Sequence, residues 1–276
     1  MRMPRALPTA LRCAAAVSLL GCGDPLATRP VPSVPELRVM LILDPDAEQQ
    51  PILLQPATGG DTLNGAAATL VSGTGTAASG SIPSERQDRE LDECHFRYGS
   101  LAGNPRCMTL TASLANGATY ALEVTSLGRL TATATTTVPG AFTIVDHEKT
   151  GTLPGTVNVR ATWTSSAGAF AYLVSITGRQ ASAGGNPSFT CAPDNVCYDR
   201  WFVSTTDTTL AATVDRRYFE NAGGPWRLQV IAMNLDAYAY IMTGESSHFF
   251  PVPPRQNIAN GFGALGAWVI RSVALQ

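Results

Sequence analysis

The sequence is poor in the residues from which catalytic sites are commonly built. Its three histidines, His95, His147 and His248, lie in different regions of the 276-residue chain. No Gly-x-Ser-x-Gly motif occurs, so a Ser-His-Asp site would have to assemble from distant loops. The nearest local cluster is Ser247-His248, but neighbouring residues of an extended segment point to opposite faces. We therefore expect no catalytic residues and no enzyme activity.

A long apolar segment and a basic excess are also lacking. The N-terminal apolar stretch Cys13–Leu20 has eight residues, whereas a membrane-spanning helix needs about 20. The chain has 19 basic and 21 acidic residues, and residues 1–21 hold three of the basic ones and no acidic one, which leaves 16 against 21. Because this body is acidic, we expect it not to bind nucleic acid.

The N-terminus has the pattern of a lipoprotein processing site. Leu19-Leu20-Gly21-Cys22 closes a segment that carries three arginines and a short apolar stretch. This arrangement is typical of a signal peptide, and the small residue before the cysteine favours lipidation. We expect residues 1–21 to be the signal peptide and Cys22 to be the lipidated first residue of the mature chain. The alternative is an ordinary signal peptide that contains a cysteine.

Acyl chains on Cys22 would anchor the protein to a membrane. Residues 22–36 contain four prolines among small and polar residues, which predicts an extended linker. Gly23 and Asp24 follow the cysteine and favour the outer membrane over the inner one. The expected localisation is the cell envelope, with the body tethered at the outer membrane.

The cysteines agree with export. Once the signal peptide and Cys22 are set aside, four remain: Cys94, Cys107, Cys191 and Cys197. An even number in an oxidising compartment predicts disulfides. Three connectivities are open, and we favour Cys94 with Cys107 and Cys191 with Cys197 because each pair closes one short loop. Only Cys94 has a histidine close to it in the sequence, His95, so we expect no metal site.

Residues 37–276 are expected to be almost wholly β-structure. Short apolar or alternating runs, punctuated by Gly and Pro, recur at a spacing typical of β-sandwiches. We predict an all-β fold of two antiparallel β-sandwich domains, residues 37–146 and 147–276, with Ser72–Ser81 as a flexible loop. Apolar residues at helical spacing follow a residue able to cap a helix in Asn234–Met242, which predicts one short helix in the second domain.

Three segments resemble a family of bacterial envelope lipoproteins of unknown function. Ala-Asn-Gly-Ala-Thr-Tyr-Ala-Leu-Glu-Val at 115–124, continuing through 128–133 to Val138-Pro139, is similar to the end of the family's immunoglobulin-like domain. Leu-Asp-Ala-Tyr-Ala-Tyr-Ile at 235–241 resembles its short Tyr-x-Tyr helix, and Asn-Ile-Ala-Asn-Gly-Phe-Gly-Ala-Leu-Gly-Ala at 257–267 resembles its closing segment. Leu265 departs from the Phe more common there.

The resemblance implies an immunoglobulin-like first domain and a lipoprotein of the surface or periplasm. Some members are associated with TonB-dependent uptake systems, which implies an outer-membrane protein as a partner. The family supplies no catalytic residues to carry over.

The closing segment also fits a nucleotide-binding pattern. Gly261–Gly266 reads Gly-x-Gly-x-x-Gly, but the dinucleotide fingerprint needs a following helix and a strand that carries an acid about 20 residues later. Ten residues remain. We therefore expect no cofactor, and we interpret the glycines as a tight loop before a last strand, Ala267–Leu275.

Two other chemistries stay open. Asp44–Glu48 and Asp194–Asp199 offer oxygen ligands for calcium, although neither has the spacing of a calcium loop and turn chemistry explains both. Aromatic residues could stack on glycans, but core packing is favoured because most lie in apolar strand or helix patterns: Trp163, Phe170, Tyr172, Trp201, Phe202, Trp226, Tyr238 and Tyr240.

These patterns predict a lipid-anchored binding or accessory module of the cell envelope. A hydrolase that acts on envelope or glycan substrates is the alternative, with a carboxylate pair drawn from four candidates whose separation the sequence does not give: Asp194, Asp199, Asp207 and Glu220. A third interpretation is a structural spacer with smooth surfaces.

Overall fold

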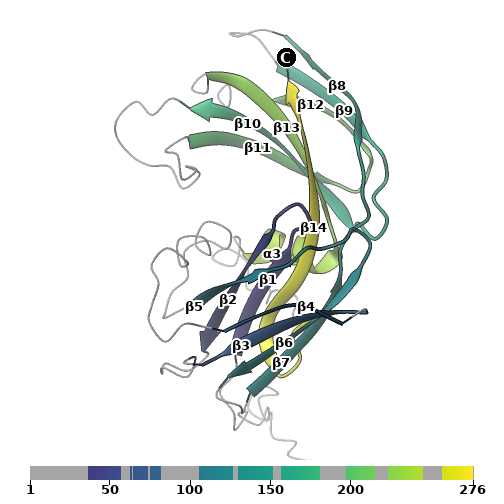
Figure 1. Cartoon of the computed structure of the whole chain (residues 1–276). Helices are drawn as coiled ribbons and strands as arrows, with labels where there is room; N and C mark the ends of the chain where they lie inside the picture. The colour runs from purple at the N-terminus through teal and green to yellow at the C-terminus, as the bar shows by residue number, and fades with distance from the viewer. Residues whose placement is uncertain are drawn as a thin grey trace, which may run out of the picture. The chain divides into compact units, whose positions relative to one another are not determined.

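The computed structural model describes residues 37–56, 63, 65–73, 75–81, 106–126, 130–151, 157–180, 197–214, 223–244 and 257–275. These residues form fourteen strands and one helix (Figure 1). The predicted all-β class with one short helix is confirmed. The predicted signal peptide and the linker 22–36 lie outside the described residues.

The first sandwich contains seven complete strands and the first part of β14 (Gly261–Leu275). The complete strands are β1 (Leu37–Leu43), β2 (Gln49–Pro56), β3 (Ala67–Ser72), β4 (Gly75–Ser81), β5 (Arg106–Thr111), β6 (Thr119–Ser126) and β7 (Leu130–Thr137). The order β1-β2-β5 packs against β4-β3-β6-β7. When the strands are lettered along the chain, this places A-B-E against D-C-F-G, which contains the C-F-G order of immunoglobulin-like sandwiches with strand D beside C. The β-sandwich architecture is therefore confirmed, and its strand order is similar to that of immunoglobulin-like domains.

A tyrosine near the start of β6 gives a second sign of this fold. The Tyr120 side chain is buried, and its hydroxyl accepts a hydrogen bond of 2.9 Å from the backbone N–H of Ala115. Immunoglobulin-like domains have such a tyrosine at the corner before strand F. Along β6, buried Tyr120, Leu122 and Val124 alternate with exposed Ala121 and Glu123, so one face meets the core and the other meets solvent.

The second sandwich repeats this strand order. It contains β8 (Ile144–Thr150), β9 (Val157–Trp163), β10 (Ala171–Gln180), β11 (Cys197–Thr205), β12 (Thr209–Val214), β13 (Gly223–Met233) and the end of β14 (Gly261–Leu275). The order β12-β9-β8 faces β11-β10-β13-β14, which is again E-B-A against C-F-G, with an extra strand beside C. The two halves thus share a topology without sharing a sequence.

The last strand belongs to both sandwiches. Residues 261–267 of β14 pair with β1 in parallel, and residues 268–275 pair with β13 in antiparallel register. β14 therefore joins strands from both halves of the chain into one seven-stranded sheet; it is the long yellow strand in Figure 1. The expected boundary between 146 and 147 falls inside β8, and residues 34–276 group as one compact unit. The division into domains 37–146 and 147–276 stays a prediction.

Two expected loops are strands. Part of Ser72–Ser81 forms β4, which pairs with β3, and Gly261–Gly266 begins β14. Both predictions of a loop were wrong because small side chains give little strand signal, although they permit close packing. A Cβ on Gly80 would lie 3.1 Å from the Leu110 side chain. A Cβ on Gly263, whose φ is 117°, would collide with the carbonyl oxygen of Val39.

The helix α3 (Leu235–Gly244) covers the outside of the joined sheet. Ala237 is fully buried and packs with apolar residues that come from both sandwiches. A Cβ on Gly266 would lie 2.7 Å from the Cα of Ala237, so the helix rests directly on the β14 backbone. The cluster beneath the helix comprises Met40, Ile42, Leu53, Cys107, Ile231 and Met233.

Gly263→Ala should destabilise the protein strongly. A methyl group here meets the β1 backbone and also forces an unfavourable φ, so we expect a loss of about 3 kcal/mol in unfolding free energy. Gly73→Ala is the matched control because Gly73 has open space around it and no positive φ; its cost should stay below about 0.5 kcal/mol. Chemical denaturation measures both. Equal stability of the two variants would contradict the close approach of β14 to β1.

Candidate functional site

Several residues singled out in the sequence lie outside the described structure: Cys22, Cys94, His95, Cys191, Asp194, Glu220 and His248. Cys107 is a buried residue of β5, and Cys197 begins β11. The lipidation of Cys22 and both disulfide pairings stay predictions. Among the residues that are described, no three His, Cys, Asp or Glu side chains come together in a metal-binding group.

The acidic segment Asp44–Glu48 forms a turn. Asp44 is 7% exposed, and its carboxylate accepts a 3.0 Å hydrogen bond from the backbone N–H of Asp46. The buried Gln50 side chain accepts from the N–H of Asp44 and donates to the carbonyl oxygens of Asp44 and Ala47. Turn chemistry therefore accounts for the Asp44 carboxylate.

The aromatic candidates divide between core and surface. Trp163 and Tyr172 are buried, with ring centroids 5.4 Å apart, so core packing is confirmed for this pair. Phe170 is 48% exposed and lies 5.2 Å from the Tyr238 ring at the helix. Phe170 thus departs from the expectation of a buried core residue.

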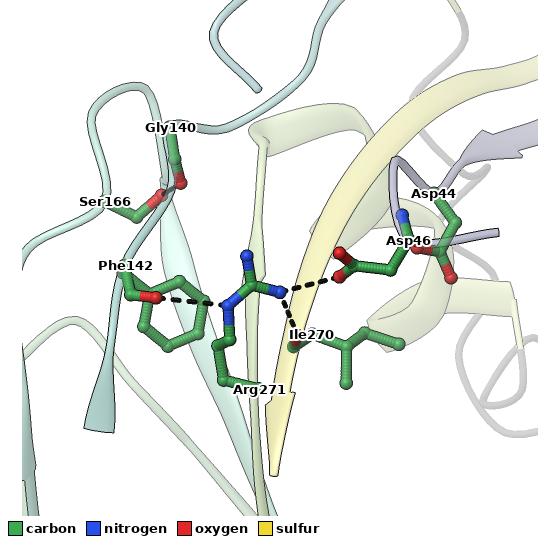
Figure 2. Close-up of polar contacts among 7 residues, drawn as sticks. All are labelled: Asp44, Asp46, Gly140, Phe142, Ser166, Ile270 and Arg271. Carbon is green, nitrogen blue, oxygen red and sulfur yellow. Dashed lines mark hydrogen bonds and ion pairs between the residues drawn. The ribbon is translucent and has the colours of Figure 1, made fainter. Parts of the chain in front are cut away.

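An arginine fastens the junction of the two sandwiches. Figure 2 shows the Arg271 guanidinium between the turn after β1 and the segment that leads into β8. Its Nη1 lies 2.7 Å from the Asp46 carboxylate, and its Nε donates to the Phe142 carbonyl oxygen at 3.2 Å. Both charged side chains are partly exposed, at 29% and 48%, so the pair contributes little more than about 1 kcal/mol. Its role is to hold the turn after β1 and the segment before β8 in place against β14.

Asn234 forms a deeper junction beneath the helix. Its buried amide donates to Thr136 Oγ1 at 2.6 Å and to the Thr137 carbonyl oxygen at 3.1 Å. Its Oδ1 accepts from the N–H groups of Ala237 and Ala267, at 3.0 and 3.1 Å. One side chain thus caps α3 and ties β7 to β14. The sequence indicated the cap but not the other contacts.

A surface depression of about 500 Å³ lies on the outer face of β3, β6 and β7, beside the segment that precedes β14. Its lining residues are Val71, Ala121, Leu122, Glu123, Thr133, Ala134, Thr135, Asn257 and Ala259. Leu122 and Ala134 have buried side chains, so the floor of the depression reaches the strand backbone. The depression is a candidate binding site in the described part of the chain.

One wall of the depression is fixed by paired hydrogen bonds. The Asn257 side chain donates to the Leu265 carbonyl oxygen at 2.8 Å and accepts from its N–H at 2.9 Å. The backbone of Ala259 exchanges two hydrogen bonds with Thr133 at the edge of β7. The asparagine of the closing segment therefore holds this wall against the sheet. The family resemblance singled out this segment, but no sequence pattern indicated the depression.

Comparison with protein-family models gave no match, and comparison with curated proteins gave none either. Among solved structures, the chain is similar to a DUF4785 family protein from Legionella pneumophila subsp. pneumophila str. Philadelphia 1, at 14% sequence identity and a TM-score of 0.26. The match covers 71% of this chain and 51% of that one, so this chain spans about half of its length. This weak likeness carries no argument about function. The resemblance to a lipoprotein family stays a prediction.

Asn234→Ala should cost about 2–4 kcal/mol of unfolding free energy, because it removes a helix cap and leaves buried backbone groups without partners. Asn158→Ala is the matched control, since the Asn158 side chain accepts one exposed hydrogen bond of 2.8 Å from Thr213. That control should lose less than about 1 kcal/mol. Urea denaturation compares the two. Similar losses for both variants would contradict the junction role of Asn234.

Proposed function

We propose that the protein is a lipid-anchored binding lipoprotein of the cell envelope that presents its β-sandwich body at the outer membrane. The open depression on the β3-β6-β7 face is the observation that carries the binding role. Its walls stand on paired strands and a hydrogen-bonded segment, and such preorganised sites bind without a large cost of ordering. Among the described residues that line it, Glu123 alone has an ionisable side chain, which favours binding over chemistry that needs two carboxylates.

The anchor in this proposal is Cys22, and the partner is an outer-membrane protein, in an uptake system of the kind that the family resemblance implies. In the described part of the chain, no helix combines the length and apolar character required to cross a membrane. The Leu-Leu-Gly-Cys sequence and the proline-rich linker support attachment by lipid.

We also propose that Cys94 pairs with Cys107 and Cys191 with Cys197. Two observations support these disulfides: the short loops that each pair would close, and the predicted export to an oxidising compartment. Cys107 lies in the buried cluster beneath α3, a position in which a disulfide would tie β5 to the preceding segment.

Cys22→Ala should release the protein from the outer membrane. Tagged wild type and variant are expressed in the native host, the membranes are separated, and intact cells are crosslinked to identify partners. Mass spectrometry of the wild type should show acyl chains on Cys22 and a gain of two hydrogens per disulfide on reduction. Cys13→Ala, inside the predicted signal peptide, is the matched control and should behave as wild type. A soluble, unlipidated wild type would contradict the anchor and reopen the hydrolase alternative.

A further inference from the structure

Glu123 is the one charged residue in strands β3, β4, β6 and β7. Its side chain is exposed, and the carboxylate makes no hydrogen bond or ion pair with the residues that the structure describes. The directly opposite residues on the neighbouring strands are Thr69 and Thr133, and Ala121 precedes it on the same face. The neighbours of the carboxylate on this face of the sheet are therefore short, neutral side chains, which leave it accessible to a cationic group.

Hydrogen-bonding groups surround this carboxylate at fixed positions. Thr69 and Thr133 lie on either side of Glu123 in the sheet register, and Thr133 and Thr135 line the depression. Antiparallel pairing alternates direction, and Thr133 bonds to Ala259 on the side away from β6, so the backbone N–H and C=O of Thr135 also point away from β6. The depression thus offers donors and acceptors beside one negative charge.

The shape of the depression favours part of a polymer over an enclosed small molecule. Its volume of about 500 Å³ lies within the range of about 300–1,000 Å³ for ligand sites, yet it is open on the surface of a sheet. An extended chain can cross such a site and continue over the adjacent threonine-rich strands. A ligand with both ammonium and hydroxyl groups would match the carboxylate and the hydroxyls together.

We propose that this depression binds an amino-sugar polymer, with a protonated amine on Glu123 and sugar hydroxyls hydrogen-bonded to Thr133 and Thr135. The inference rests on the proposed binding function and names its ligand class. The net negative charge of the body, 16 basic against 21 acidic residues after residue 21, favours the approach of a cationic polymer.

The test uses glucosamine trimer as the probe and the protein purified from its host in detergent. Isothermal titration calorimetry at mildly acidic pH, where the amines are protonated, should show saturable binding. Glu123→Gln should weaken it about three- to tenfold, as expected for loss of a charge-assisted contact at an exposed site. Glu148→Gln is the matched control because Glu148 is also exposed, on β8 of the second sandwich, and it should leave the affinity unchanged.

Two further probes separate charge from sugar chemistry. Cellotriose has the hydroxyls without the amines, and spermidine has amines without hydroxyls; both should bind more weakly than glucosamine trimer. Absence of saturable binding, equal affinity of wild type and a folded Glu123→Gln variant, or spermidine binding as tight as the trimer would overturn the proposal. A Cys22-anchored protein that does not bind the trimer overturns the ligand class alone, whereas trimer binding by an unlipidated protein overturns only the anchor.

Discussion

The close approach of β14 to the β1 backbone is the contact on which the rest of the structure depends. Glycines at 261, 263 and 266 have no Cβ, so β14 can lie against Leu37, Val39 and the helix residue Ala237. Residues 261–267 of β14 pair with β1, and residues 268–275 of the same strand continue into the sheet of the second sandwich, where they pair with β13. Asn234 is hydrogen-bonded to Ala267, where the pairing of β14 changes from β1 to β13. Four residues later on β14, Arg271 donates a hydrogen bond to the carbonyl oxygen of Phe142.

Residue patterns predicted the elements whose side chains alternate and missed those whose pairing depends on small residues. Strand β6 and helix α3 follow directly from alternation and from a cap followed by helical spacing. Strand β4 and the start of β14 consist largely of Gly, Ala, Ser and Thr, so their partners are set by backbone approach rather than by apolar periodicity. Contacts such as Arg271 with Asp46, 225 residues apart in sequence, leave no local pattern.

The same shared strand connects the architecture to the proposed binding site. The segment that leads into β14 closes the edge of β7, and its Asn257 side chain is bonded to Leu265 within β14. Any displacement of β14 would therefore move one wall of the depression that holds Glu123. The glycines of the Gly-x-Gly-x-x-Gly pattern allow β14 to lie close to β1 and α3, and the segment before them forms one wall of the depression.

Differential scanning calorimetry of the purified protein tests this account most directly. If β14 makes the two sandwiches one cooperative structure, unfolding should give a single transition whose calorimetric and van't Hoff enthalpies agree. Two separate transitions, each with the enthalpy of one sandwich, would contradict the central role of the shared strand.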